Sequence, residues 1–186
     1  MISFVNRKSN RISEIVFSPE WKMHNSLRFL DLSHNQIIMF PTQLLKFPNL
    51  QTLLLDHNRI SKFAQIPSTD RRVVSKSLRI LSFHHNQVDS LPDIFFGLCS
   101  GLAELWMHNN MLTNLPLNTS MLVDLQTLTL SSNRLRQLPD VFNQLTSLKE
   151  LWIQQNPLAD VPQSIVQRKI HIFLHSLGGS ALHHDS

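Results

Sequence analysis

Six stretches of the chain repeat one pattern: LRFLDLSHNQI (27–37), LQTLLLDHNRI (50–60), LRILSFHHNQV (78–88), LAELWMHNNML (102–112), LQTLTLSSNRL (125–135) and LKELWIQQNPL (148–158). Their first leucines stand 23, 28, 24, 23 and 23 residues apart. Each stretch fits L-x-x-L-x-L-x-x-N-x-L when other large apolar residues are accepted at the leucine positions. Self-similarity at a nearly constant period indicates a stacked repeat architecture.

We number each repeat from its first leucine. The apolar residues at positions 4 and 6 predict a short strand that turns these two side chains inward and positions 3 and 5 outward. Position 9 is asparagine in every copy, and a buried asparagine can bond the backbone groups that a turning chain leaves unpaired. We therefore predict a structural asparagine ladder made of Asn35, Asn58, Asn86, Asn110, Asn133 and Asn156. A single repeat cannot bury its own apolar edge, so neighbouring repeats must stack.

This pattern resembles the leucine-rich-repeat superfamily over roughly residues 2–162. The segments FPTQLLKFPNL (40–50) and LPDVFNQLTSL (138–148) resemble the 23-residue form of the intracellular Ras-suppressor and Scribble-type group. The resemblance implies an α/β solenoid, a horseshoe with a parallel sheet on the concave face and an irregular or 3-10 convex side. It further implies a ligand on the concave face and an adaptor or scaffold role in signalling.

The ends of the chain depart from the repeat. Residues 1–26 hold a degenerate first repeat or N-terminal cap, in which Arg7 stands where an inward apolar residue belongs. Six repeats follow over 27–162. The apolar spacing in 163–177 predicts an amphipathic capping helix, and we expect 178–186 to be a disordered tail. Either the degenerate strand is the cap, or the chain is a fragment of a larger multidomain leucine-rich-repeat protein with a regulatory or targeting role.

Composition bears on the compartment and on the class of protein. The chain has 186 residues, a formal net charge of +4 and one cysteine, Cys99, so it can form no internal disulfide. A polar, basic start lacks the apolar core of a signal peptide, and no apolar run approaches the length of a membrane span. The cysteine-rich caps of extracellular relatives are absent. From these features we predict a cytoplasmic protein, with a nuclear location as the alternative, that is not secreted.

Sequence motifs for catalysis are missing, and we predict no enzyme and no cofactor. The chain has no G-x-S-x-G, H-E-x-x-H or C-x-x-C motif. Histidines stack at position 8 (His34, His57, His85) and position 7 (His84, His108) and could in principle converge on zinc. Because this column faces solvent, we predict no metal and favour a pH-dependent face. Basic residues form no single stripe and are poorly interleaved with aromatic ones, so nucleic-acid binding is the less favoured alternative.

The candidate binding surface is the outward face of the strands. Position 5 carries two tryptophans, Trp106 and Trp152, on an otherwise largely polar face. Tryptophan is enriched among interface hot spots, although lateral packing of each indole on its neighbours is the alternative explanation. We predict that a protein partner contacts Trp106, Trp152, Glu104, Glu150, His108, Leu54, Asp56 and His84.

Charge is distributed unevenly along the chain. Residues 1–77 hold eleven Lys and Arg against five Asp and Glu, and residues 78–160 hold four against seven. We expect a monomer, with weak head-to-tail association at low salt left open. The second repeat is longer, and its tail over 64–77, with Arg71 and Arg72, predicts a protruding loop that offers an alternative binding surface.

Overall fold

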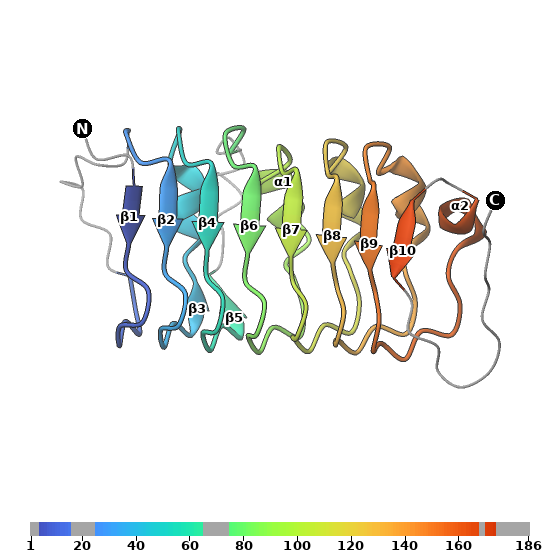
Figure 1. Cartoon of the computed structure of the whole chain (residues 1–186), viewed down its shortest axis with the longest axis horizontal. Coiled ribbons are helices and arrows are strands. Elements are labelled where there is room, and N and C mark those ends of the chain that lie inside the picture. The colour runs from blue at the N-terminus through green and yellow to red at the C-terminus, as the bar shows by residue number, and fades with distance from the viewer. Residues whose placement is uncertain (1–3, 16–24, 65–74, 168–169, 174–186) are drawn as a thin grey trace.

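The computed structural model describes residues 4–15, 25–64, 75–167 and 170–173. Eight short strands form one parallel sheet, in which the strands lie side by side along the length of the molecule (Figure 1). In spatial order they are β1 (Phe4–Asn6), β2 (Phe29–Asp31), β4 (Thr52–Leu54), β6 (Ile80–Ser82), β7 (Glu104–Trp106), β8 (Thr127–Thr129), β9 (Glu150–Trp152) and β10 (His171–Phe173). The predicted solenoid with a parallel sheet is confirmed.

The register of the sheet aligns equivalent repeat positions. Leu105 pairs with Leu128, and Leu128 with Leu151, so the position-4 side chains form one continuous row. All three are buried. Since successive side chains of a strand point to opposite faces, positions 3 and 5 of every strand turn to the outer face of the sheet.

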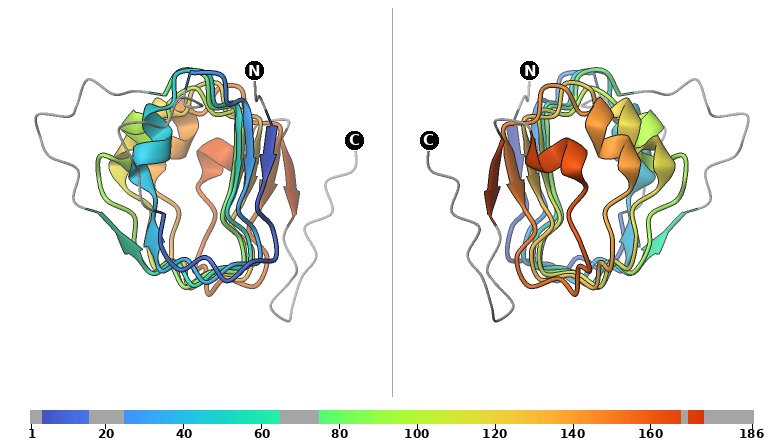
Figure 2. Two further views of the ribbon diagram at one scale, coloured as in Figure 1. Left: turned by 90° about the vertical axis from the view of Figure 1, so that its left-hand side faces the viewer. Right: turned by 90° about the vertical axis from the view of Figure 1, so that its right-hand side faces the viewer.

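Short helical segments lie opposite the sheet and enclose the core between the two layers (Figure 2). They are the 3-10 helices η1 (Thr42–Lys46), η3 (Leu117–Met121) and η4 (Asp140–Gln144) and the α-helix α1 (Phe95–Leu98). The helix α2 (Gln163–Val166) lies at the end of the solenoid, beyond β10 (Figure 1). A second, two-stranded parallel sheet joins β3 (Met39–Phe40) to β5 (Lys62–Phe63). The sheet and this second layer bury one apolar cluster along the solenoid.

Each position-9 asparagine bonds two neighbouring repeats, as Asn110 shows. Its Nδ2 donates to the carbonyl oxygen of Met107 in its own repeat and to that of Phe83 in the preceding repeat, both at 3.1 Å. Its Oδ1 accepts from the backbone N–H of Val88 at 3.0 Å. Equivalent bonds are made by the rest of the ladder, Asn35, Asn58, Asn86, Asn133 and Asn156, and all six asparagines are buried.

Position 8 has a backbone role that the sequence did not disclose. Every non-glycine residue with positive φ in the described part of the chain occupies this position: Ser9, His34, His57, His85, Asn109, Ser132 and Gln155, with φ between 52° and 59°. This left-handed conformation is several-fold enriched in asparagine, aspartate and histidine and disfavours β-branched residues. The turn conformation therefore accounts in part for the histidines at this position.

The capping helix predicted over 163–177 is wrong for the described residues beyond Val166. Helix α2 ends at Val166, and the chain returns to the sheet as β10, parallel to β9. The N–H of His171 donates to the carbonyl oxygen of Lys149 at 2.8 Å, so the backbone at the edge of the sheet finds partners. The unpaired N–H and C=O groups at the edge of a sheet favour pairing with one more strand. The remaining residues of the predicted helix and the predicted tail over 178–186 lie outside the described residues.

No helix in the described ranges is both long enough and apolar enough to cross a membrane.

At the other end of the sheet, β1 pairs with β2. Arg7, just beyond β1, has an exposed side chain, and its N–H donates to the carbonyl oxygen of Asp31 at 2.8 Å. The degenerate first repeat thus continues the sheet even though its position-6 side chain does not enter the core.

Candidate protein-binding site

Trp106 and Trp152 lie on the same outer face of the sheet. Trp106 of β7 pairs with Thr129 of β8, which pairs with Trp152 of β9, so one strand separates the two indoles. Trp106 is 37% exposed, and Trp152 is half-buried. Neither indole is enclosed between repeats, because position 4 of each strand supplies the buried leucine instead.

Trp106 is surrounded by polar groups. Its Nε1 donates to Oε2 of Glu104 at 3.2 Å. The ring of His108 lies 6.3 Å from the indole, centroid to centroid, and its Nδ1 lies 2.9 Å from Oγ1 of Thr129. Glu150 occupies the same sheet position on β9 as Glu104 on β7. The sheet face around Trp106 therefore combines an exposed aromatic ring with the carboxylate of Glu104 on the same strand and that of Glu150 two strands away.

Trp152 stacks on Phe173, a residue that the sequence analysis missed. The ring centroids are 3.8 Å apart and the planes differ by 17°. Phe173 is 36% exposed and comes from β10, the strand that takes the place of the predicted helix. The alternation His171, Ile172, Phe173 was the available signal, because it repeats the outward-inward-outward order of a strand.

Leu54 and Asp56, two other predicted contact residues, come from the repeat of β4, two strands from Trp106. Leu54 on β4 is half-buried in the row that runs through Ser82 to Trp106. Asp56 is 9% exposed, and its Oδ1 accepts from the Ser82 hydroxyl and, at 3.2 Å, from the N–H of His84. The Asp56 carboxylate therefore bonds the next repeat and is nearly buried, so it does not join the tryptophans on the exposed face.

The histidines form two stacked columns at the ends of the strands. In the position-8 column, His57 stacks between His34 and His85, with centroid distances of 4.3 Å on each side. In the position-7 column, His84 stacks on His108 at 4.2 Å. The columns meet edge to edge, with His84 lying 5.3 Å from His57 and 5.1 Å from His85. Because the stacked rings lie close together, a positive charge on one imidazole disfavours protonation of the next.

The titration of the cluster follows from burial and crowding. Burial lowers the pKa of His84 to about 3, and the adjoining His108 and His85 add to the effect. Burial lowers the pKa of the half-buried His108, and partial loss of solvent around the exposed His57 lowers its pKa as well, in both cases with help from neighbouring histidines. Burial raises the pKa of Asp56 to about 6, although bonds from Ser82 and His84 oppose the rise. At neutral pH the Asp56 carboxylate therefore faces a neutral His84 imidazole, 3.4 Å from its Nε2.

The structure also bears on two other features of the sequence, Cys99 and the loop predicted over 64–77. Cys99 is fully buried, and burial raises the pKa of its thiol, so it is a core residue rather than a nucleophile. Arg71 and Arg72 of the predicted protruding loop lie outside the described residues, while Ser75 at its end is buried and its N–H donates to the carbonyl oxygen of Leu98 at 2.7 Å.

Comparisons with known proteins find repeats of the same kind. Residues 25–68 and 123–165 match the family described as Leucine Rich repeats (2 copies). Human lumican is 35% identical over 117 residues, which are 62% of this chain and 32% of lumican. Podocan-like protein 1 of Mus musculus is 31% identical, over 71% of this chain and 23% of that protein. The chain thus spans about a third of human lumican.

The solved structure of a leucine-rich-repeat protein from Leptospira interrogans has a similar fold. The two chains superpose with a TM-score of 0.68 at 33% sequence identity. The match covers 78% of this chain and 36% of the other. The architecture that the two chains share is the stack of leucine-rich repeats.

These relatives correct the predicted location. Lumican and podocan-like protein 1 are extracellular leucine-rich-repeat proteins, and this finding overturns the prediction of a cytoplasmic protein that is not secreted. That prediction gave too much weight to the single cysteine. Cys99 lies in a core that is held together by stacked leucines and asparagines, so it says nothing about the redox state outside. From the repeat, the parallel solenoid and these matches, the chain belongs to the leucine-rich-repeat family.

Proposed function

We propose that this chain is a non-catalytic protein-binding module, with a scaffold or adaptor role, that uses the outer face of β7–β10. The binding surface, here called the tryptophan patch, consists of Trp106, Trp152, Phe173, Glu104, Glu150 and His108. The single observation that carries the proposal is the exposure of Trp106 beside a stacked Trp152–Phe173 pair on one sheet face. Leucine-rich repeats are typical of protein-binding modules, and this fold is generally non-catalytic.

The chemistry of the tryptophan patch selects the kind of partner. Large aromatic side chains contribute much of the energy of protein interfaces when they become desolvated. The carboxylates of Glu104 and Glu150 stand beside them and favour cationic groups. Residues 78–160 also carry more acidic than basic side chains, seven against four. The expected partner segment therefore presents Lys or Arg next to a large apolar residue.

A binding measurement with defined peptides tests this function. Fluorescein-labelled peptides that combine Lys or Arg with Leu or Trp are titrated with the full chain, and polarisation gives the Kd. Trp106→Ala together with Trp152→Ala should weaken the tightest peptide by 30-fold or more, since a hot spot contributes about 2 kcal/mol. The matched control is Leu117→Ala, which removes an exposed apolar side chain (73% exposed) from η3 in the layer opposite the sheet.

Two results decide the matter. A large loss of affinity in the double variant, with the affinity of the control unchanged and the double variant still folded at the temperature of the titration, supports the tryptophan patch as the binding surface. Equal affinity of the double variant and the unchanged chain rejects it. Charge-reversed peptides, with Glu in place of Lys and Arg, serve as the specificity control and should bind at least tenfold more weakly.

A further inference from the structure

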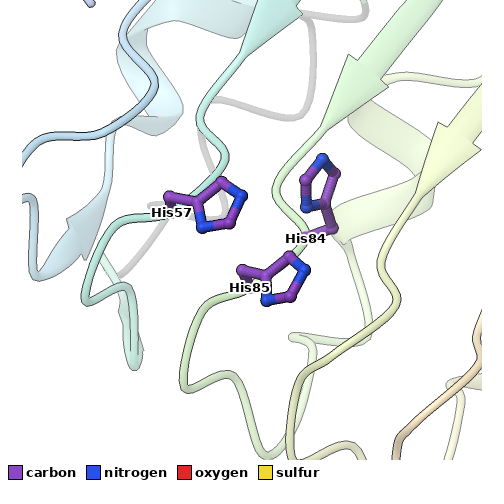
Figure 3. A group of neighbouring side chains, drawn as sticks. All are labelled: His57, His84 and His85. Carbon is purple, nitrogen blue, oxygen red and sulfur yellow. The ribbon is translucent and has the colours of Figure 1, made fainter. Parts of the chain in front are cut away.

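The two histidine columns converge at the ends of β4 and β6. His57 follows β4, and His84 and His85 follow β6, so two adjacent turns of the solenoid supply the three side chains (Figure 3). One nitrogen from each ring lies within 4.8 Å of one nitrogen from each of the others. His57 and His85 are exposed, while His84 is half-buried beneath them. Three imidazoles with this mutual spacing form a candidate ligand set.

The half-buried ring, His84, has an unsatisfied nitrogen. Its Nε2 lies 3.4 Å from Oδ2 of Asp56. Its Nδ1 is buried and has no hydrogen-bond partner within the described ranges. Figure 3 shows the His84 ring standing edge-on with one nitrogen turned toward His57 and His85. A carboxylate at Nε2 favours the tautomer that keeps its proton there, which leaves a free lone pair on Nδ1.

We propose that His57, His84 and His85 bind one borderline divalent cation of the Zn²⁺ type, with Asp56 as the positioning residue that orients His84. Histidine nitrogens bind Zn²⁺ at about 2.0–2.1 Å, which places ligands in a tetrahedral site about 3.4 Å apart. The present spacing, up to 4.8 Å, is wider than this, so binding requires the two exposed rings to turn toward His84. Three protein ligands leave a fourth position for water or for a donor from a partner.

The backbone explanation for these histidines is incomplete. Positive φ favours histidine at position 8, yet Asn109, Ser132 and Gln155 satisfy the same turn in the later repeats. His84 stands at position 7, where no positive φ is required, so the turn does not account for its orphaned Nδ1. A buried polar atom without a partner is costly, and a cation at Nδ1 removes that cost. The geometry thus revises the expectation of no metal that was drawn from the sequence.

Calorimetric titration of the full chain with Zn²⁺, after dialysis against a chelator, tests the proposal. The expected result is saturable binding at one ion per chain with a raised unfolding midpoint. Mg²⁺ prefers oxygen ligands and should give no heat beyond dilution. His57→Asn with His85→Asn removes two ligands and keeps a residue type that position 8 already accepts in Asn109, so folding should be preserved. This variant should weaken Zn²⁺ binding by at least a hundredfold.

Further variants separate the site from other histidines. Asp56→Asn should weaken binding about tenfold or more, as expected for a positioning carboxylate, and carbon-13 shifts of His84 should report its changed tautomer. His34→Asn is the matched control at position 8, and His183→Ser with His184→Ser removes the pair near the C-terminus. Both should bind Zn²⁺ like the unchanged chain. The proposal is overturned if Zn²⁺ does not saturate a single site, if the His57/His85 variant binds normally, or if only the His183/His184 change abolishes binding.

Discussion

The indole of Trp152 and the ring of Phe173 stack at 3.8 Å, and this contact joins the last strand of the sheet to the tryptophan patch. The two residues are 21 positions apart in the chain but occupy the same register position on β9 and β10. The terminal strand therefore has two roles. It covers the edge of β9, and it completes the aromatic part of the proposed binding surface.

Phe173→Ala should loosen β10 and expose Trp152. An aromatic pair contributes about 0.5–1.5 kcal/mol beyond the area it buries, and we expect a loss of about that size in the free energy of unfolding. Urea denaturation followed by tryptophan fluorescence measures the loss, and the emission of the folded state should shift to the red. Phe4→Ala, which removes a stacked partner of Phe29 at the opposite edge, is the control. If it causes the same red shift, the effect does not arise from Trp152.

Asn110→Ala should destabilise the chain by about 1–3 kcal/mol, because buried backbone donors and acceptors lose their partner. The affected groups belong to two repeats, through the bonds to Phe83 and Val88. Chemical denaturation measures the difference, with exposed Asn114→Ala as the control. A midpoint equal to that of the control would show that the ladder contributes no stability at this repeat.

Ser132 tests the left-handed turn without touching the histidines. Its φ is 54°, so Ser132→Val should cost about 1–3 kcal/mol in backbone strain, whereas Ser132→Gly should cost less because glycine adopts positive φ freely. Both changes remove the hydroxyl bond to Gln155 equally. Thermal unfolding should therefore show the valine variant as the less stable of the two, because its backbone strain exceeds the extra chain entropy that glycine loses on folding. Equal midpoints would contradict a strict backbone requirement at position 8.

With chelator present, stability should fall as the pH is lowered from 7.5 to 5.5. The pKa values of His84, His108 and His57 are lowered in the folded state, so below pH 6.5, the ordinary histidine value, the unfolded chain binds more protons and gains stability. The raised pKa of Asp56, about 6, acts in the opposite direction, since the folded carboxyl takes up a proton first. Urea midpoints across this range should show the net fall. His84→Gln should flatten the profile, and an unchanged slope would contradict the role of His84.

Glu104→Gln with Glu150→Gln should weaken a basic-apolar peptide about tenfold at low salt and leave a smaller difference at 0.5 M salt, because the carboxylates act through screened attraction. Stopped-flow mixing should assign most of the change to the association rate. Asp160→Asn, an exposed acidic residue beyond β9, is the control. A loss of peptide affinity that does not change with salt would show that the substitutions act through packing around Trp106 and not through charge.

Much of the fold was predictable from the sequence because its determinants recur locally. The leucines at positions 4 and 6 and the asparagine at position 9 specify strand, inward face and turn within eleven residues of chain, and stacking then follows from the need to bury each repeat. The same alternation placed Trp106 and Trp152 on one outer face, as the pairing through Thr129 shows.

What only the tertiary structure decided depends on contacts between repeats. Asp56 looks like any outward polar residue in the sequence, yet the Ser82 hydroxyl and the backbone of His84, from the next repeat, draw it inward. Phe173 becomes part of the tryptophan patch because the open edge of β9 recruits the following segment as a strand, a pairing that outweighs its helical apolar spacing. The orphaned Nδ1 of His84 likewise follows from how two turns pack, since burial and hydrogen-bond partners belong to the assembled solenoid and to no single repeat.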